Sequence, residues 1–427
     1  MRTILQQHLH ALGGEPRAIR ECRIVDAFRT TLVGPCWVTY DVQFETANAA
    51  RGATARVTGV LYRDAKKARA AFDELDRFWA TGGGAAPVTQ PFFSLPELNM
   101  LLVVFLYDPY LPALASLMLG PPPAIEPLLL GPLGTGDWRA GGWDVEPIRY
   151  RFGKIATLRL SARALEARAF AKVYFHDDKG AHAYQAFARL RERATQGAAF
   201  SVPAPLAYDD ELGTLFLEDV PGTSLEDPFR RGEEATAAVR RTAAALAELH
   251  LSDLAVAEPR IDLHNELGRL ERSAELLRSA RAELAPAVDQ IVGAAVERLA
   301  EVPPAPTLGD FKAAHVLVDG DRLGLIDVDQ LAGSDPVLDV ARFMTQLWSA
   351  APEFALPSKR TRAIAMEFAE EYFTHAPRSW RARLPVRYAM ALVVHIAARH
   401  WRQEPDWPDQ AEAFVAEAMT AVTGRWG

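Results

Sequence analysis

The feature that most constrains the fold is a pair of short apolar segments in the C-terminal third of the chain, each bordered by a carboxylate. Residues 308–318 read LGDFKAAHVLV and residues 324–329 read GLIDVD, with a short polar turn between them. Apolar, β-branched runs on both sides of a polar turn predict a β-hairpin. Asp310 and Asp327 lie at the edges of these runs, 17 positions apart. Any fold of this chain must therefore accommodate two carboxylates at the borders of apolar strands.

These carboxylates, with a polar side chain between them, form a set that phosphoryl transfer to a hydroxyl group requires. One carboxylate orients the attacking hydroxyl and accepts its proton, which makes Asp310 the candidate base. Asp327 is the candidate magnesium ligand, because a carboxylate beside a buried strand is costly without a metal or a partner. His315, five positions after Asp310, is a second candidate metal ligand. The alternative is a structural hairpin with charged ends.

Two further motifs follow in order, Ser334-Asp335-Pro336 and Asp339-Val340-Ala341. Together with Gly309-Asp310 and Ile326-Asp327, they resemble the C-lobe signature of the aminoglycoside phosphotransferase-like kinases, a superfamily that includes choline kinases and maltokinases and is related to the protein kinases. The resemblance covers roughly residues 145–427. It implies an α+β, protein-kinase-like bilobal fold, Mg²⁺ and ATP or GTP as cofactors, and transfer of the γ-phosphate to a small-molecule hydroxyl.

Two residues depart from the pattern that the resemblance implies. His315 stands where the family usually has asparagine, and imidazole is a poorer ligand for magnesium than an amide oxygen. Leu308 stands where the family usually has histidine before Gly-Asp, so its effect is expected to be on packing. These departures keep open the alternative of a pseudokinase that binds nucleotide, or nothing, and acts as a scaffold.

The order of strand and helix patterns along the chain indicates three segments. Residues 1–142 form an N-terminal α+β domain that ends in a Pro/Gly-rich passage, residues 120–136, expected to be a linker. Residues 143–221 form a strand-rich N-lobe, and residues 222–427 form a helical C-lobe with the catalytic segment 308–341. Residues 267–302 of the C-lobe are expected to be helical, with a break at Pro286.

The N-terminal domain matches the N-lobe at a nearly constant offset. Residues 56–64 match 169–177 at an offset of 113, and residues 88–91 and 97–98 match 202–205 and 211–212 at an offset of 114. This pattern predicts a degenerate repeat of the N-lobe, in which Gly59 takes the place of Lys172. Such a copy would lack the phosphate-binding cation and would serve as a cap or an interface. The alternative is that any two strand–helix–strand units look alike.

The resemblance also implies nucleotide contacts in the N-lobe. Lys172 is the candidate phosphate-binding lysine, because an ammonium group inside an apolar strand needs a ligand or a carboxylate. Its alternative is an exposed lysine on an edge strand. Gly153 and Lys154 form the expected phosphate-covering turn between two strands, although Lys154 could equally lie in solvent. Glu218 and Val220 belong to a hinge-like segment whose backbone would meet the nucleotide base.

Composition excludes several other classes of protein. The net charge of −8 provides no positive field for a nucleic-acid backbone. The two cysteines, Cys22 and Cys36, cannot form a disulfide framework, and the N-terminus lacks the apolar core of a signal peptide, so we expect a cytoplasmic protein. The most apolar stretch, residues 98–120, is interrupted by Asp108 and two prolines. It is expected to be a buried strand, a turn and a helix, with no membrane association.

Three functions remain open at this point. The first is an active phosphotransferase that acts on a small-molecule hydroxyl. The second uses the same chemistry on a serine or threonine of a biosynthetic precursor peptide, with the N-terminal domain as a docking platform. The third is the pseudokinase scaffold, which would bind a protein partner through the N-terminal domain.

Overall fold

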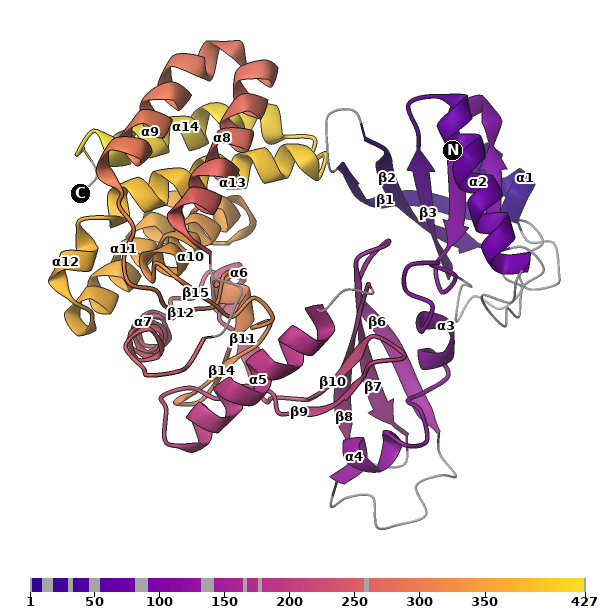
Figure 1. Cartoon of the computed structure of the whole chain (residues 1–427), viewed down its shortest axis with the longest axis horizontal. Coiled ribbons are helices and arrows are strands. Elements are labelled where there is room, and N and C mark those ends of the chain that lie inside the picture. The colour runs from indigo at the N-terminus through magenta and orange to yellow at the C-terminus, as the bar shows by residue number, and fades with distance from the viewer. Residues whose placement is uncertain are drawn as a thin grey trace. The chain divides into compact units, whose positions relative to one another are not determined.

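The computed structural model describes residues 2–9, 18–29, 34–45, 54–80, 91–131, 142–163, 167–175, 179–256 and 261–425 (Figure 1). Residue contacts divide the chain into two compact units. The first comprises Met1–Gly180, Leu206–Leu217 and Trp401–Glu404, and the second comprises Ala181–Pro205, Glu218–His400 and Pro405–Gly427. Strands dominate the first unit and helices the second, which confirms the expected α+β class.

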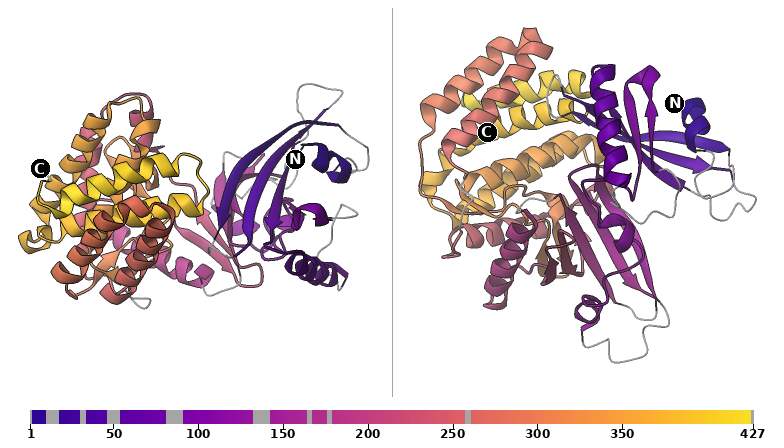
Figure 2. Two further views of the ribbon diagram at one scale, coloured as in Figure 1. Left: turned by 90° about the horizontal axis from the view of Figure 1, so that it is seen from above. Right: turned by 45° about the vertical axis from the view of Figure 1, so that its right-hand side comes forward.

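The first unit opens with a five-stranded sheet in the order β1-β2-β3-β5-β4. Helix α2 (Ala65–Ala80) packs against β4 and β5 of this sheet (Figures 1 and 2). A short helix, α1 (Arg2–Leu9), precedes the sheet and contacts β1. The strands are β1 (Ile19–Arg29), β2 (Cys36–Phe44), β3 (Thr54–Leu61), β4 (Phe92–Leu95) and β5 (Met100–Val104).

A second five-stranded sheet follows in the order β6-β7-β8-β10-β9. Helix α5 (Lys179–Thr195) separates its third and fourth strands in the sequence, as α2 does in the first sheet. The alternating burial of β7 is typical of a strand with one face in a core. The strands are β6 (Trp143–Arg151), β7 (Ile155–Ala162), β8 (Arg168–Tyr174), β9 (Pro205–Asp209) and β10 (Thr214–Glu218).

The two sheets therefore have the same strand order and the same position for the intervening helix. Strand β10 follows β5 at an offset of 114 residues, and Gly59 lies on β3, the third strand of its sheet in the chain, as Lys172 lies on β8. A Cβ atom added to Gly59 would lie 2.8 Å from the Met100 sulfur, so the Met100 side chain would have to shift to admit a larger residue there. The repeat itself stays a prediction, and its matches at residues 88–90 and 176–177 lie outside the described residues.

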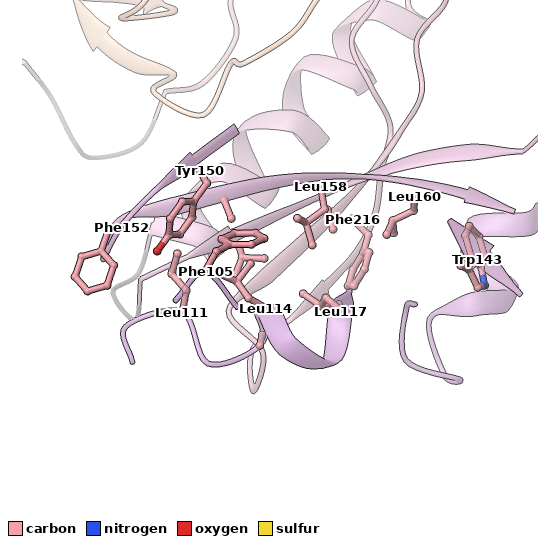
Figure 3. Packing of buried hydrophobic residues seen from close by; sticks show 14 of the residues in the cluster. Phe105, Leu111, Leu114, Leu117, Trp143, Tyr150, Phe152, Leu158, Leu160 and Phe216 are labelled. Atoms are coloured by element: carbon pink, nitrogen blue, oxygen red, sulfur yellow. The ribbon is translucent and has the colours of Figure 1, made fainter. Parts of the chain in front are cut away.

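One apolar core joins residues of both sheets in the first unit (Figure 3). Phe105, which follows β5, packs edge-on against Tyr150 of β6, with ring centroids 4.7 Å apart. Leu111 and the short helix α3 (Leu114–Leu117) complete this contact. The N-terminal sheet is thus packed onto the N-lobe sheet through the segment after β5. Residue contacts place both sheets in one compact unit. They therefore do not test the expected domain boundary at residue 142, which stays a prediction.

Part of the expected linker, residues 120–136, proves to be packed structure. Helix α4 (Glu126–Leu130) lies inside it, and Leu129 and Leu130 are buried. The indole nitrogen of Trp143 donates to the Glu126 carboxylate at 2.7 Å. The apolar side chains of this Pro-rich segment explain the difference, because they can be buried in the core of the unit. Residues 132–136 lie outside the described residues.

The second unit is mainly helical and contains two small sheets, in the orders β11-β13-β14 and β12-β15. Helix α7 packs against α11, which also packs against α10, while α9 packs against α8 and α14 (Figure 2). The helices are α6 (Glu226–Arg230), α7 (Thr236–His250), α8 (Leu263–Ala280), α9 (Ala285–Arg298), α10 (Val337–Ala350), α11 (Ser358–His375), α12 (Arg378–Arg381), α13 (Leu384–Trp401) and α14 (Trp407–Val422). The strands are β11 (Thr223–Ser224), β12 (Ala305–Thr307), β13 (Val316–Asp319), β14 (Arg322–Leu325) and β15 (Ala332–Ser334).

Several smaller expectations can be compared directly with this structure. The helical region 267–302 breaks between α8 and α9, and Pro286 occupies the first turn of α9, where proline is tolerated. Cys22 and Cys36 are both free thiols. Within the described ranges, none of the helices combines the length and the apolar character that crossing a bilayer requires.

Candidate active site

The candidate site is built on the hairpin of β13 and β14, as the sequence predicts. Val316 pairs with Leu325, and the amide of Ile326 donates to the carbonyl of His315 at 2.9 Å. The register therefore brings His315 and Asp327 to the same end of the hairpin. Ser201 extends this sheet, because its amide donates to the Leu323 carbonyl at 2.7 Å and its own carbonyl accepts from Leu325 at 2.8 Å.

Asp310, His315 and Asp327 each place one candidate ligand atom in a cluster whose members all lie within 4.8 Å of one another. The Nε2 atom of His315 is 3.1 Å from a carboxylate oxygen of Asp327. Two adjacent ligands of an octahedral magnesium ion, with bonds of about 2.1 Å, lie about 3 Å apart. The donor atoms present therefore fit a divalent cation, with Asp327 as the oxygen ligand that such a cation prefers.

The hydrogen bonding of His315 also favours a cation beside its Nε2 atom. Its Nδ1 atom lies 3.0 Å from the backbone carbonyl of Asp310. Since a carbonyl can only accept, we assign the hydrogen to Nδ1. In the neutral ring, the lone pair of Nε2 then faces the Asp327 carboxylate. Both the Nε2 atom of His315 and the Asp327 oxygen, 3.1 Å away, are then acceptors. A cation or a proton between these two atoms would stabilise their approach.

Asp327 has a left-handed backbone conformation, with φ of 57°. Among non-glycine residues this conformation is unfavourable, and aspartate and asparagine tolerate it best. Such residues are often found at functional sites, where the surrounding structure compensates for the strain. The turn at Asp327 directs the chain away from β14 directly after the hairpin, at the residue that carries the candidate ligand.

Asp339 fixes the segment that carries the candidate base. Its side chain is fully buried in the first turn of α10, and its two oxygens accept from the amides of Leu308 at 2.6 Å and Gly309 at 3.0 Å. His250, at the end of α7, contacts the same carboxylate at 3.3 Å and the Tyr372 hydroxyl at 2.8 Å. In the sequence, Asp339 stands out only as part of the Asp339-Val340-Ala341 motif, and the geometry shows that its side chain orients this segment. Leu308 is itself buried.

Two cationic side chains lie near Asp310, and the first of them, Lys312, was not identified from the sequence. The ammonium of Lys312 lies 3.0 Å from the Asp310 carboxylate. The guanidinium of Arg342, on α10, donates to the carbonyl of Gly309. The position of Lys312, two residues after the candidate base, was the available signal, because i and i+2 side chains of an extended segment share a face.

A buried charge network lies elsewhere in the second unit. Asp335 accepts from Arg383 at 2.9 Å and from Arg387 at 3.0 Å, and Arg387 also donates to Glu266. Burial acts to raise the pKa of Asp335, but the two arginines lower it below its ordinary value. Burial raises the pKa of Glu266. A cavity of about 200 Å³ borders this network. Because each of these charges is paired, we assign the network to stability.

The candidate hinge residues also belong to the second unit. The amide of Glu218 donates to the Ala204 carbonyl at 3.0 Å, and its carboxylate accepts from the Ala204 amide at 3.1 Å. Arg191 lies 3.4 Å from the same carboxylate. A Cβ atom at Gly324 would meet the Val220 side chain at 2.8 Å, so Val220 packs closely on the catalytic hairpin. The hinge role of Glu218 and Val220 stays a prediction.

The remaining candidates belong to the first unit. Lys172 is 7% exposed and lies on β8, the middle strand of its sheet, so the alternative of an exposed lysine on an edge strand is wrong. Phe152, Gly153 and Lys154 form the tight turn between β6 and β7, and Gly153 has a φ of 65°. Burial and then the neighbouring Arg151 lower the pKa of Lys154, whose ammonium lies 4.8 Å from the centre of the Phe28 ring.

A carboxylate that sequence reasoning treated only as an interruption of an apolar stretch contacts this turn. Asp108 is 1% exposed and accepts from the amide of Gly153 at 2.7 Å and from the hydroxyl of Tyr150 at 3.1 Å. Its other oxygen accepts from the amide of Tyr110 at 3.0 Å. Burial raises the pKa of Asp108 to about 6, although these hydrogen bonds act to lower it.

We expect this buried carboxyl to make stability depend on pH. Its pKa is raised from 3.8 to about 6 in the folded protein, so the folded state holds the proton more tightly. Its stabilising contribution is therefore complete below pH 3.8 and is lost as the pH rises through about 6, a change of about 3 kcal/mol. The other ionisable groups near it are Tyr150 and Tyr110, which have Arg56 and Glu74 as their own neighbours.

Urea unfolding between about pH 4 and about pH 7 measures this effect. The free energy of unfolding of the wild type should fall with rising pH relative to that of Asp108→Asn, which cannot ionise. A constant difference between the two proteins over this range would contradict the expectation.

The chain is similar to known proteins over parts of both units. The model of the phosphotransferase enzyme family, APH, matches residues 156–383, more than half of the chain. No curated protein sequence matches the chain. A choline kinase from Cryptosporidium parvum Iowa II matches with a TM-score of 0.50 at 12% identity, over 73% of this chain and 96% of that chain.

Two further solved structures are similar at lower TM-scores. A choline/ethanolamine kinase family protein from Mesorhizobium loti has a TM-score of 0.45 and 17% identity, over 70% of this chain and 97% of its own. A protein from Ralstonia eutropha described as an aminoglycoside phosphotransferase has a TM-score of 0.47 and 14% identity, over 66% of this chain and 93% of its own. At these identities the likeness concerns the fold alone, and the match to the choline kinase agrees with the expected bilobal architecture.

Proposed function

The chain belongs to the phosphotransferase enzyme family, and from this membership we propose that it is a magnesium-dependent kinase that transfers the γ-phosphate of ATP to a hydroxyl group of a small molecule. The observation that supports this most directly is the cluster of Asp310, His315 and Asp327 at one end of the catalytic hairpin. It combines a candidate base and candidate metal ligands in the order that the family motif requires.

Asp310 is the proposed base. A hydroxyl group is a weak nucleophile, so a carboxylate within hydrogen-bond reach orients it and accepts its proton. Asp339 holds the two amides that precede Asp310, which fixes the direction of its side chain. Lys312, 3.0 Å from the Asp310 carboxylate, places a positive charge where the negative charge of a transferred phosphoryl group would be stabilised.

Asp327 and His315 are the proposed metal-binding residues. A magnesium ion held by these residues would neutralise negative charge on the phosphates of the nucleotide. The carboxylate of Asp327 supplies the stronger interaction, because magnesium prefers oxygen ligands. His315 contributes through Nε2, while its Nδ1 hydrogen bond keeps the ring oriented and links it to the backbone of Asp310.

The first unit is proposed to contribute nucleotide contacts. Lys172 is a buried cation, and a buried ammonium is best stabilised by an anionic group such as a phosphate or a carboxylate. The turn at Gly153 and Lys154 is proposed to cover the phosphates. In the hinge segment, the amide of Val220 is the proposed donor to the base, because the amide of Glu218 already donates to Ala204.

We expect Asp327→Asn to abolish the magnesium-dependent part of ATP binding. Asparagine tolerates the left-handed backbone at this position and removes only the charge. In a thermal-shift experiment, ATP at about 100 times its Kd stabilises a protein by about 2.7 kcal/mol. Wild type should show an ATP-induced rise in Tm that increases with magnesium, and Asp327→Asn should lose this increase. Lys172→Ala should lose most of the rise with or without magnesium.

Two matched variants serve as controls for this experiment. Asp319→Asn removes an exposed carboxylate at the end of β13 and should behave as wild type. His315→Asn replaces the imidazole by an amide oxygen, which magnesium accepts, and should keep the magnesium-dependent increase. An unchanged increase in Asp327→Asn would contradict the proposed metal site.

The donor and the acceptor are then found by measuring ADP or GDP release in the presence of small hydroxyl compounds. Turnover with a sugar, an amino alcohol or an aminoglycoside would support the proposal and name the acceptor class. Turnover with serine- or threonine-containing peptides only would favour the peptide-kinase alternative. Magnesium-dependent nucleotide binding without any turnover would favour the pseudokinase scaffold.

A further inference from the structure

We propose that Asp108, in the segment after the N-terminal sheet, is a positioning residue for nucleotide binding because it holds the turn between β6 and β7 in place. This inference rests on the proposed phosphate-covering role of that turn. It assigns the N-terminal domain a defined task within the same enzyme, since the segment that carries Asp108 follows directly from β5.

The contacts of Asp108 are directed at the turn itself. One carboxylate oxygen accepts from both the amide of Gly153 and the hydroxyl of Tyr150, at the end of β6. The other oxygen accepts from the amide of Tyr110, which fixes the carboxylate relative to its own chain segment. The Gly153 amide is thus bound to a group 45 residues away in the sequence. A carboxylate–amide bond of this kind is stronger than one between neutral groups.

Aromatic side chains enclose the same turn. The ring of Tyr110 lies edge-on to Phe152 and to Phe175, with centroids 5.9 Å and 5.5 Å apart. A Cβ atom at Gly153 would come within 3.1 Å of the Tyr110 ring, and the φ of 65° at this position also favours glycine. The ammonium of Lys154 lies 4.8 Å from the Phe28 ring centre. Phe28 in turn stacks on Trp37 of β2, with centroids 4.7 Å apart.

The N-terminal domain therefore contacts each residue of the turn from 152 to 154. A phosphate-covering turn without such support would have to be ordered when the nucleotide binds, which costs conformational entropy. Because the N-terminal domain already holds the turn in the folded protein, its conformational entropy is lost during folding and not when the nucleotide binds. The burial of a charged carboxylate to achieve this is itself unfavourable, as its raised pKa shows. A polar group kept at such a cost is more consistent with a specific task than with general stability.

The experiment compares ATP with adenosine on the full-length protein. Asp108→Leu removes both acceptor oxygens while keeping the branched shape of the side chain, and Asp108→Asn keeps one acceptor. Isothermal titration gives the Kd for Mg-ATP and for adenosine, which lacks phosphates. We expect Asp108→Leu to weaken Mg-ATP binding about tenfold, Asp108→Asn to weaken it less, and both to leave adenosine binding within about twofold of wild type.

The variant Tyr150→Phe and a hydrogen-exchange measurement distinguish a local effect on the turn from a general loss of folding. Tyr150→Phe removes one hydrogen bond to the same carboxylate oxygen but leaves the bond to Gly153, so its Mg-ATP affinity should equal that of wild type. Hydrogen exchange of the peptide that contains Gly153 should accelerate in Asp108→Leu and stay slow in Tyr150→Phe.

The outcomes separate this inference from the function on which it rests. Parallel loss of ATP and adenosine binding in Asp108→Leu would show a general structural role and overturn the inference. Unchanged ATP binding together with unchanged exchange at the turn would also overturn it. Failure of the wild type itself to bind Mg-ATP would instead reject the proposed nucleotide function, and the inference with it.

Discussion

Asp310→Asn should lower kcat for phosphoryl transfer by about 10²- to 10⁴-fold while leaving the Kd for Mg-ATP within about threefold of wild type. The asparagine side chain has the same shape as aspartate but cannot accept a proton from the acceptor hydroxyl. It can still accept a hydrogen bond from Lys312, which lies 3.0 Å from the carboxylate in the wild type. The loss should therefore be confined to the chemical step.

The geometry indicates that Asp310→Asn should affect catalysis and leave the proposed metal site intact. His315 is bound by the backbone carbonyl of Asp310, which the substitution does not change. The proposed metal ligands should consequently keep their orientation, and the magnesium-dependent rise in Tm with ATP should persist. The measurements are initial rates with the acceptor found in the screen and thermal shifts with Mg-ATP. A kcat within about tenfold of wild type would rule out Asp310 as the base.

Asp339→Asn should lower both stability and activity, with a loss of about 2–4 kcal/mol in the free energy of unfolding. Both oxygens of Asp339 accept from backbone amides, those of Leu308 and Gly309. An asparagine must turn its NH₂ group toward one of these donors, which leaves a buried amide without an acceptor. Because Asp310 follows directly, the candidate base should also lose its fixed position, and kcat should fall.

Tyr372→Phe is the matched control for this substitution. Tyr372 contacts the other ring nitrogen of His250, so its replacement removes one hydrogen bond of the same chain of contacts without touching the carboxylate. Its cost should be about 1 kcal/mol, with little effect on kcat. Urea unfolding and steady-state kinetics measure both variants. A smaller loss of stability in Asp339→Asn than in Tyr372→Phe would show that the carboxylate does not organise the segment.

The catalytic hairpin shows why the sequence could predict a large part of the site. Its strands, its turn and its two carboxylates lie within 22 residues, from 308 to 329. Over such a distance, the alternation of apolar and polar residues and the turn residues are sufficient to set the register. The register then places His315 and Asp327 at one end. Spacing and residue type, together with the family resemblance, led to the prediction of a candidate metal site there.

For the N-terminal domain, the sequence indicated a repeated unit but did not predict which residues are buried. A nearly constant offset of 113 to 114 residues indicated a repeated unit, and both sheets have the same strand order. The Pro/Gly-rich passage at residues 120–136 was expected to be a linker, because proline and glycine are local signals for turns. The structure buries Leu129 and Leu130 of this passage, since burial depends on which surface lies nearby and not on the local sequence.

Contacts between residues far apart in the sequence could not be predicted. Arg387 is 52 residues from Asp335 and 121 from Glu266, yet all three meet in one buried network. Asp108 is 45 residues from Gly153, and in the sequence it only interrupts an apolar stretch. No periodicity relates such positions, because their approach depends on how strands and helices pack.

The sequence by itself determined the α+β class, indicated a repeated unit through a nearly constant offset, and singled out Asp310, His315 and Asp327 as candidate site residues. These are properties of short segments, in which side-chain alternation, turn residues and motif spacing act locally. Only the tertiary structure decided that Asp339 holds the catalytic segment and that Asp108 holds the turn at Gly153. Each of these carboxylates binds backbone amides of another segment, and packing of the whole unit brings them together.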